Sequence, residues 1–122
     1  MVGAVAYMVW GLLHLGLGIS MVVDATSQGL PTDELNAESL MFFICAAVFG
    51  AQAIAVGWFL NRFNDRVGYW LNLIVLGLID VAFVAVMVIP GHVDPVGGLS
   101  GPAVWALAAA ASTVAIRRSR RD

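Results

Sequence analysis

Four long apolar stretches, separated by short polar segments, divide the chain. They cover approximately residues 2–23, 38–60, 67–89 and 103–116. About 20 apolar residues in a helix, at a rise of about 1.5 Å each, match the ~30 Å hydrocarbon core of a bilayer. The pattern therefore predicts an all-α membrane protein. We expect four transmembrane helices in an up-and-down bundle that forms one integral membrane domain, 1–122.

The first apolar stretch, 2–23, has to be distinguished from a secretory signal peptide. Residues 23–25 loosely fit a cleavage site. The stretch has no basic start, however, and it exceeds the apolar core of about 7–15 residues that signal peptides have. We therefore expect a retained transmembrane helix.

Turn and capping residues mark the connections between the stretches. A Gly-Leu-Pro sequence at 29–31 breaks the chain after the first stretch. Thr32, which precedes two acidic residues, is expected to N-cap a helix that continues into the second stretch. Pro90 ends the third stretch, and Ser100, ahead of a Gly-Pro pair, is expected to N-cap the fourth.

The cations predict the orientation. All six are arginines: Arg62 and Arg66 lie between the second and third stretches, and the other four follow the fourth. The connections after the first and third stretches contain neither Lys nor Arg. The positive-inside rule then places both termini and the 61–66 connection in the cytoplasm. Exclusive use of Arg, with abundant Ala, Gly and Val, is typical of a GC-rich bacterial genome and indicates a multi-pass protein of the bacterial plasma (inner) membrane.

Composition excludes several classes of protein. The chain is 61% hydrophobic and 11% charged, whereas about a quarter of a soluble domain is charged. A net charge of −2 without a basic face gives no reason to expect nucleic acid. A single cysteine, Cys45, excludes an internal disulfide and a CxxC redox pair. No catalytic motif is present, so an enzyme acting alone is not predicted.

Asp80, in the middle of the third stretch, is the residue that most needs an explanation. An Asp at the centre of a transmembrane helix costs roughly 2.5 to 3.5 kcal/mol, which the surrounding apolar residues offset. Counted from the predicted cytoplasmic side, His14 and Gln52 fall at a similar depth. Turning the three side chains toward one another keeps them out of lipid. We therefore expect Asp80 to meet His14 or Gln52, directly or through one water.

Helix periodicity predicts what surrounds this polar layer. Residues 38, 45, 52 and 59 recur every seven positions and are expected to form one stripe on the second helix. Cys45 is accordingly expected to be a small buried side chain. The residues predicted to line a pocket around the layer are Tyr7, Trp10, Cys45, Phe49, Gly77, Phe83, Met87 and Trp105.

Two interpretations of the layer remain open. In the first, Asp80 and His14 form a protonatable pair that binds a ligand or relays a proton, because burial disfavours their charged forms and mutual attraction favours them. In the second, the three side chains only fix the register of the helices. Interhelical polar contacts of that kind contribute ~0.6–2 kcal/mol.

No cofactor or metal is predicted. Haem needs an axial His, and His14 is the only one inside an apolar stretch, since His92 lies too far outward. A quinone is a further alternative. The acidic residues and His92 in the outer connections lack a metal-ligand spacing such as HxxxH, which favours a solvated rim.

The sequences WGLLH at 10–14 and GLID at 77–80, in this four-stretch layout, resemble small DoxX-like four-helix integral membrane proteins. The resemblance implies a relation to subunits of quinone-linked membrane oxidoreductases. Two functions follow as expectations. One is a module that binds or moves a small lipophilic or protonatable molecule through His14, Gln52 and Asp80. The other is a structural or accessory subunit of a larger membrane complex; small residues that let helices approach closely favour a homo-oligomer or such a complex.

Overall fold

The computed structural model describes residues 1–119, which are helical apart from short connections. In chain order the helices are α1 (Val2–Thr26), α2 (Glu34–Phe59), the 3-10 turn η1 (Asn61–Phe63), α3 (Arg66–Leu71), the π-helical η2 (Asn72–Leu76), α4 (Gly77–Phe83), the π-helical η3 (Val84–Val88), α5 (Pro95–Gly98) and α6 (Ser100–Arg118). The only β pairing among these residues is an isolated bridge between Ser27 and Gly29. The predicted all-α class is confirmed.

Four helical segments of the described chain are long and apolar enough to cross a membrane. They are Val2–Thr26, Glu34–Phe63, Arg66–Val88 and Pro95–Arg118. These segments overlap the four predicted apolar stretches. The first, second and fourth are longer than predicted: the first runs on to Thr26, the second spans Glu34–Phe63, and the fourth begins already at Pro95.

Both predicted N-caps are wrong. Asp33, rather than Thr32, caps α2, and its Oδ1 accepts a hydrogen bond of 3.0 Å from the backbone N–H of Asn36. Ser100 is the first residue of α6, and its hydroxyl donates to the carbonyl of Gly97 instead of accepting from the helix. The fourth segment starts earlier because Asp94 caps α5.

Close backbone contact joins α1 to α2. A Cβ on Gly11 would lie 2.6 Å from the carbonyl oxygen of Gly50, and a Cβ on Gly50 would lie 2.5 Å from the backbone nitrogen of Leu15. No side chain fits at either position. These two glycines therefore decide which faces of α1 and α2 meet, since lipid provides no hydrophobic drive between helices.

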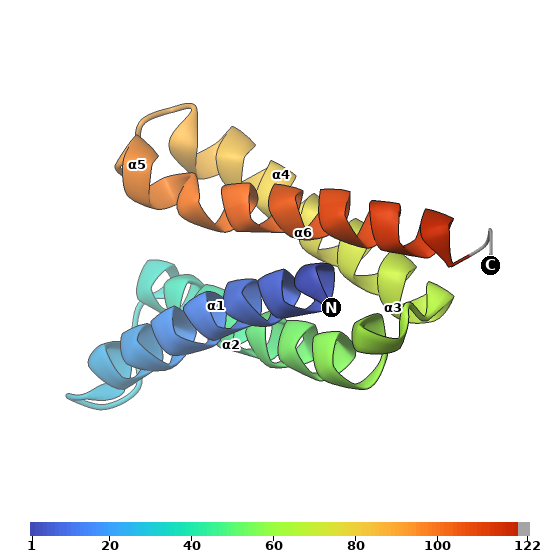
Figure 1. Cartoon of the computed structure of the whole chain (residues 1–122). Helices are drawn as coiled ribbons and strands as arrows, with labels where there is room; N and C mark the ends of the chain where they lie inside the picture. Colours follow the sequence, from blue (N-terminus) through green and yellow to red (C-terminus); the bar gives the residue numbers. More distant parts are fainter. Residues whose placement is uncertain (120–122) are drawn as a thin grey trace.

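The first half of α1 also lies against α6. Gly3 contacts Ser112 near one end, and His14 contacts Gly101 near the other, so the two helices run antiparallel. In Figure 1, α1 and α2 form one pair, and α4 and α6 belong to a second pair. The pairs lie close near the termini and diverge toward α5.

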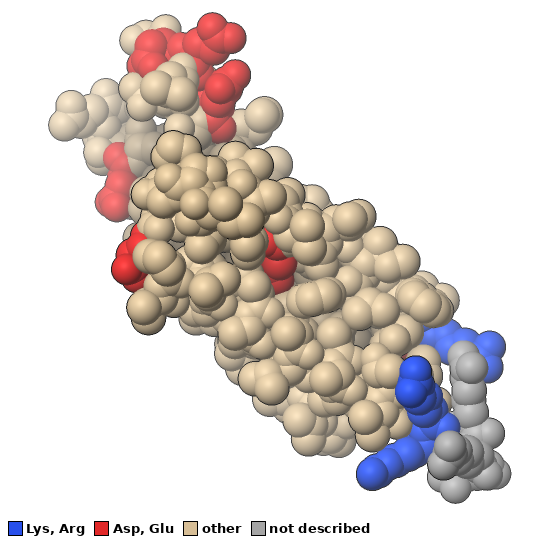
Figure 2. Space-filling view, turned by 90° about the horizontal axis from the view of Figure 1, so that it is seen from above, with Lys and Arg blue, Asp and Glu red and all other residues tan. Residues whose placement is uncertain are grey.

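Burial follows this divergence. The fully buried residues of α2 are Gly50, Ala53 and Gly57, all in its second half, and those of α1 end at Gly18. The core lies in the packed half and consists of Tyr7, Trp10, Ala53, Leu76 and Ala108. Positive and negative side chains are also separated along the molecule. On the face shown in Figure 2, arginines gather at one end and acidic side chains lie toward the other.

Candidate functional site

Asp80 is buried and has a single hydrogen-bond donor among the described residues. It lies in the first turn of α4 and is 3% exposed. Its Oδ2 accepts a hydrogen bond of 3.0 Å from the indole Nε1–H of Trp10, which is fully buried on α1. A hydrogen bond to an ionised acceptor is stronger than one between neutral groups. This contact joins the two helix pairs through Asp80, a side chain whose burial is costly.

His14 lies directly on the same tryptophan. The rings of His14 and Trp10 stack with centroids 3.7 Å apart and an angle of 17° between their planes. The Nδ1 of His14 is 2.9 Å from the backbone carbonyl oxygen of Trp10. A carbonyl only accepts, so this hydrogen bond requires a proton on Nδ1. In the neutral imidazole, Nε2 then carries the lone pair.

Gly101, at the start of α6, brings the two ionisable side chains to one place. A Cβ built on Gly101 would lie 2.8 Å from Cε1 and 3.3 Å from Nε2 of His14, and 3.7 Å from Oδ1 of Asp80. Nε2 and Oδ1 therefore both lie within 4 Å of one point on α6. Residues from three helices form this site, and the absence of a side chain at Gly101 leaves the space that it occupies.

The free atoms of the site are both acceptors. Within residues 1–119, Oδ2 of Asp80 and Nδ1 of His14 are engaged with Trp10, whereas Oδ1 and Nε2 receive no hydrogen bond. No hydrogen bond or ion pair joins the two side chains among these residues, so they do not share one proton directly. Each free acceptor needs a hydrogen-bond donor from elsewhere when it lies in an apolar region.

An apolar pocket leads to Asp80 from the surface. Its volume is about 290 Å³. Its lining comes from α4, the π-helical η3 and the start of α6: Asp80, Val81, Val84, Ala85, Ile89, Pro102 and Trp105. Val81 and Ile89 are 63% and 76% exposed, so the pocket opens on the outer, apolar surface. Asp80 is the only ionisable residue in the lining.

The segment that carries Asp80 is irregular on both sides. Seven α-helical residues, Gly77–Phe83, separate the π-helical segments η2 and η3. π turns are rare, and they occur mostly as local bulges at functional sites. Here they determine which residues before and after Asp80 face α6, so they shape the pocket wall.

Of the residues predicted to line the pocket, only Trp105 does so. Tyr7 is fully buried, Phe49 and Trp105 pack against the core, and Gly77 lies against the indole of Trp105. Phe83 and Met87 are half-buried. The hydroxyl of Tyr7 and the Nε1–H of Trp105 are buried without a partner in the described chain.

Gln52 does not join the layer. No hydrogen bond among residues 1–119 links it to His14 or Asp80, and its Nε2 is buried without a partner. The prediction that Cys45 is buried is wrong, and Glu38 and Phe59 of the same stripe are exposed as well. The close approach at Gly50 turns a different face of α2 inward, which heptad spacing alone does not reveal.

Two features of the site were missed in the sequence. Trp10 was expected only to line the pocket, yet it is the hydrogen-bond partner of both ionisable residues. Its spacing of four from His14 places both on one helix face and indicated a contact. Gly101 was treated as part of a helix start, and no local pattern shows that Asp80 packs against it.

The site provides two possible metal ligands. Among the described residues no group of three or more His, Cys, Asp or Glu side chains is placed to hold a metal ion. The comparisons with known proteins add no further assignment: no family model, no curated protein and no solved structure matches this chain.

Proposed function

We propose that this protein is a multi-pass membrane protein that binds a small lipophilic molecule with a hydrogen-bond donor at Asp80 and His14. The observation that carries the proposal is the pocket of about 290 Å³, which opens on the apolar surface and ends at Asp80. A ligand enters it sideways from the bilayer. Its donor group then hydrogen-bonds to Asp80, the ionisable residue in the pocket lining, on the side of the carboxylate nearest His14 and Gly101.

The energetics of the site support this role. A carboxylate and an imidazole lone pair that both border the space at Gly101 are costly in a membrane unless each is protonated or hydrogen-bonded. Intramembrane ionisable residues generally mark ligand or proton pathways. The site therefore exchanges a bound proton for a ligand donor, which makes ligand binding depend on pH.

The size of the pocket limits the ligand. A volume of about 290 Å³ lies just below the ~300–1,000 Å³ of pockets that hold drug-sized molecules. A single ring or short chain with one hydroxyl or amine group fits that description. The resemblance to DoxX-like proteins makes the head group of a quinol one candidate, held by hydrogen bonds to these two residues.

The test is binding of a hydrophobic phenol, 4-butylphenol, to the purified protein in micelles, followed by tryptophan fluorescence. Asp80→Asn is the decisive variant. Its amide oxygen still accepts from Trp10, and an amide N–H takes the place of Oδ1, so the variant loses the acceptor that we propose for the ligand. We expect binding to fall at least tenfold while the free energy of unfolding is unchanged or rises, because a buried charge is removed.

The matched control is Asp94→Asn, which changes an exposed carboxylate in a loop. It should bind the phenol like the wild type. Equal binding by the wild type and Asp80→Asn, with a flat pH profile for both, would leave only the structural role of the polar layer.

A second function, as an accessory subunit, is favoured by the exposed outer halves of α1 and α2. Large apolar side chains are exposed there, among them Leu17, Val23, Met41 and Ile44. This surface suits either lipid or the helices of a partner. Purification in mild detergent distinguishes the two. A stable partner subunit would co-purify with this chain, whereas a surface that contacts only lipid would give a homo-oligomer or a monomer.

We also propose that the arginine-rich end of the molecule lies in the cytoplasm of a bacterial cell, in the plasma membrane. Support comes from the separation of charge. Arg62, Arg66, Arg117 and Arg118 lie at one end of the four segments, and the connections 27–33 and 89–94 at the other end contain no Lys or Arg. Positive residues next to transmembrane helices are retained in the cytoplasm.

A further inference from the structure

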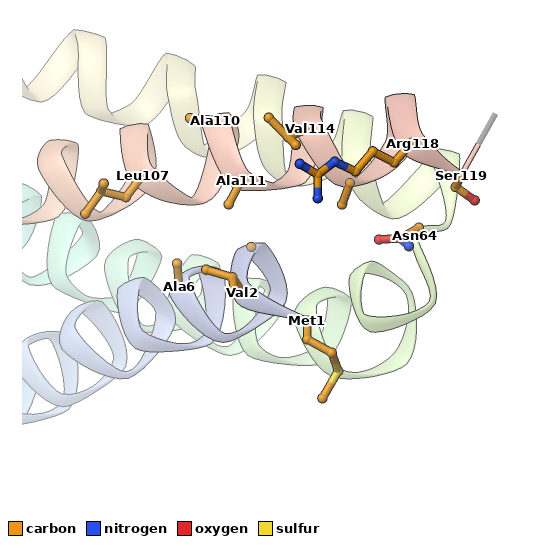
Figure 3. A pocket seen from close by; sticks show the side chains of 12 residues that line it. Met1, Val2, Ala6, Asn64, Leu107, Ala110, Ala111, Val114, Arg118 and Ser119 are labelled. Atoms are coloured by element: carbon orange, nitrogen blue, oxygen red, sulfur yellow. The ribbon is translucent and has the colours of Figure 1, made fainter. Parts of the chain in front are cut away.

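A second, larger groove lies at the arginine-rich end, between the start of α1 and the second half of α6. Its volume is about 940 Å³. The walls are mainly small or branched apolar side chains, including Val2, Ala6, Leu107, Ala110 and Val114 (Figure 3). It is separate from the Asp80 pocket, and the two share no lining residue.

Three polar side chains line this groove. They are Asn64, in the turn before α3, Arg118, in the last turn of α6, and Ser119, which follows it. Figure 3 shows the Arg118 side chain running back along α6, so that its guanidinium group lies near Val114 rather than beyond the helix end. Its neighbour Arg117 is exposed and does not line the groove.

The position of Arg118 along the helix corresponds to the level of lipid headgroups. Pro95–Arg118 is long enough to cross a membrane, and Arg118 is its last residue. The apolar part of the groove then lies in the hydrocarbon region, and the guanidinium lies at the interface. Basic pockets between helices at this depth bind anionic lipid headgroups.

We propose that this groove binds one anionic phospholipid. An acyl chain lies along Ala6 and Ala110, and the headgroup phosphate accepts hydrogen bonds from Arg118 and from the amide of Asn64. Guanidinium and phosphate match in charge and in planar geometry. A second copy of the chain is a poor occupant, because a two-fold interface here brings the arginines of both copies together.

The experiment measures the affinity of the full chain for phosphatidylglycerol and for phosphatidylcholine with the same acyl chains, by native mass spectrometry from micelles. We expect one lipid bound with a preference of about fivefold or more for phosphatidylglycerol, since a basic residue near the surface contributes that much. Arg118→Gln should abolish the preference. Arg117→Gln, the matched control in the same helical turn, should retain it.

A second pair of variants tests the acyl chain. Ala110→Leu fills the groove and should weaken both lipids about equally, whereas Ala106→Leu, one turn earlier on the exposed surface, should weaken neither. Inorganic phosphate should not compete with the lipids for the groove, because phosphate has no acyl chain.

Three results would overturn the proposal. One is equal affinity for both lipids, and another is an equal loss in Arg117→Gln and Arg118→Gln, which indicates diffuse attraction to the arginine-rich end. The third is a protein dimer that Ala110→Leu dissociates, which identifies a second copy as the occupant. Each is distinct from a failure of ligand binding at Asp80, because the two sites share no residue.

Discussion

At the scale of single residues, Trp10 makes three contacts with the two ionisable side chains, two through its indole and one through its backbone. Its indole donates to Asp80, its ring stacks on His14, and its carbonyl oxygen accepts from the same imidazole. The three contacts fix which atoms of Asp80 and His14 stay free. The chemistry of the site therefore depends on a residue that does not itself titrate.

Trp10→Phe tests this dependence. It keeps an aromatic ring beside His14 but removes the only hydrogen-bond donor to Oδ2 of Asp80 among the described residues. We expect the free energy of unfolding to fall by about 1.5 to 3 kcal/mol, the usual range for a hydrogen bond to a charged group. Chemical unfolding in mixed micelles measures this loss.

Two comparisons define the result. Trp70→Phe changes a half-exposed indole and should alter stability by less than about 0.5 kcal/mol. In Asp80→Asn the same Trp10→Phe change should cost less, because the acceptor is neutral. Additive losses in the double variant would show that the hydrogen bond does not couple the two residues.

At the scale of elements, the start of α6 shapes the site through what Gly101 lacks. The imidazole of His14 occupies space that any side chain at 101 would enter, with Cε1 only 2.8 Å from a Cβ position. The π-helical η3 adds Val84 and Ala85 to the wall of the pocket. Two helices and an irregular third segment thus position two ionisable side chains.

Gly101→Ala should displace the His14 ring. We expect destabilisation of about 1–3 kcal/mol, typical of overpacking, and a loss of phenol binding. Gly97→Ala is the control, because a Cβ there meets only Asp94 Oδ2 at 3.6 Å, an ordinary contact. Thermal unfolding and the phenol titration report the two effects. Unchanged binding in Gly101→Ala would show that the ligand does not lie between His14 and Asp80.

The N-terminus of α2 provides a prediction about pH. The backbone N–H of Asn36 donates to Asp33 and holds the pKa of that carboxyl below its ordinary value of 3.8. A lowered pKa in the folded state means that the cap stabilises α2 fully above pH 3.8 and loses its effect as the pH falls through the lower value.

We therefore expect hydrogen-exchange protection of the Asn36 amide to decrease between about pH 4 and pH 2, after correction for intrinsic exchange. Asp33→Asn keeps an acceptor oxygen and does not titrate, so its protection should stay constant over this range. A matching decrease in both proteins would assign the change to another group.

At the scale of the whole molecule, the two helix pairs are packed only over the half that contains the core. Glycines bring α1 and α2 together, α6 covers the first half of α1, and the outer halves diverge (Figure 1). Cys45 is exposed in the divergent part for this reason. The outer halves are the surface available to lipid or to a partner.

The orientation of the molecule is tested with reporter fusions in a bacterial host. A reporter fused after residue 122 should be active in the cytoplasm, and one inserted at Gln28 should be active outside, because arginines are retained inside. Substituting Arg62, Arg66, Arg117 and Arg118 with Gln should weaken this bias. Reversed activities would contradict the orientation. Activity of both reporters on the same side would contradict the odd number of membrane crossings that we expect between Gln28 and residue 122.

The sequence by itself determined the class of the fold and identified the ionisable residues inside the apolar stretches. A run of about 20 apolar residues has few alternatives to a long helix, since every backbone polar group must be paired within the segment. It also singled out Asp80 and His14, because ionisable residues are rare in such runs. Helix ends were less certain, as Thr32 and Ser100 show, because neighbouring residues compete for the same cap.

Only the tertiary structure decided which faces meet. In lipid-compatible helices both faces are apolar, so periodicity does not separate inside from outside, and Cys45 and Gln52 were misplaced for that reason. Backbone approach at Gly11 and Gly50 sets the rotation of α1 against α2. The space at Gly101 then sets where His14 and Asp80 lie, and that depends on residues almost ninety positions apart in the chain.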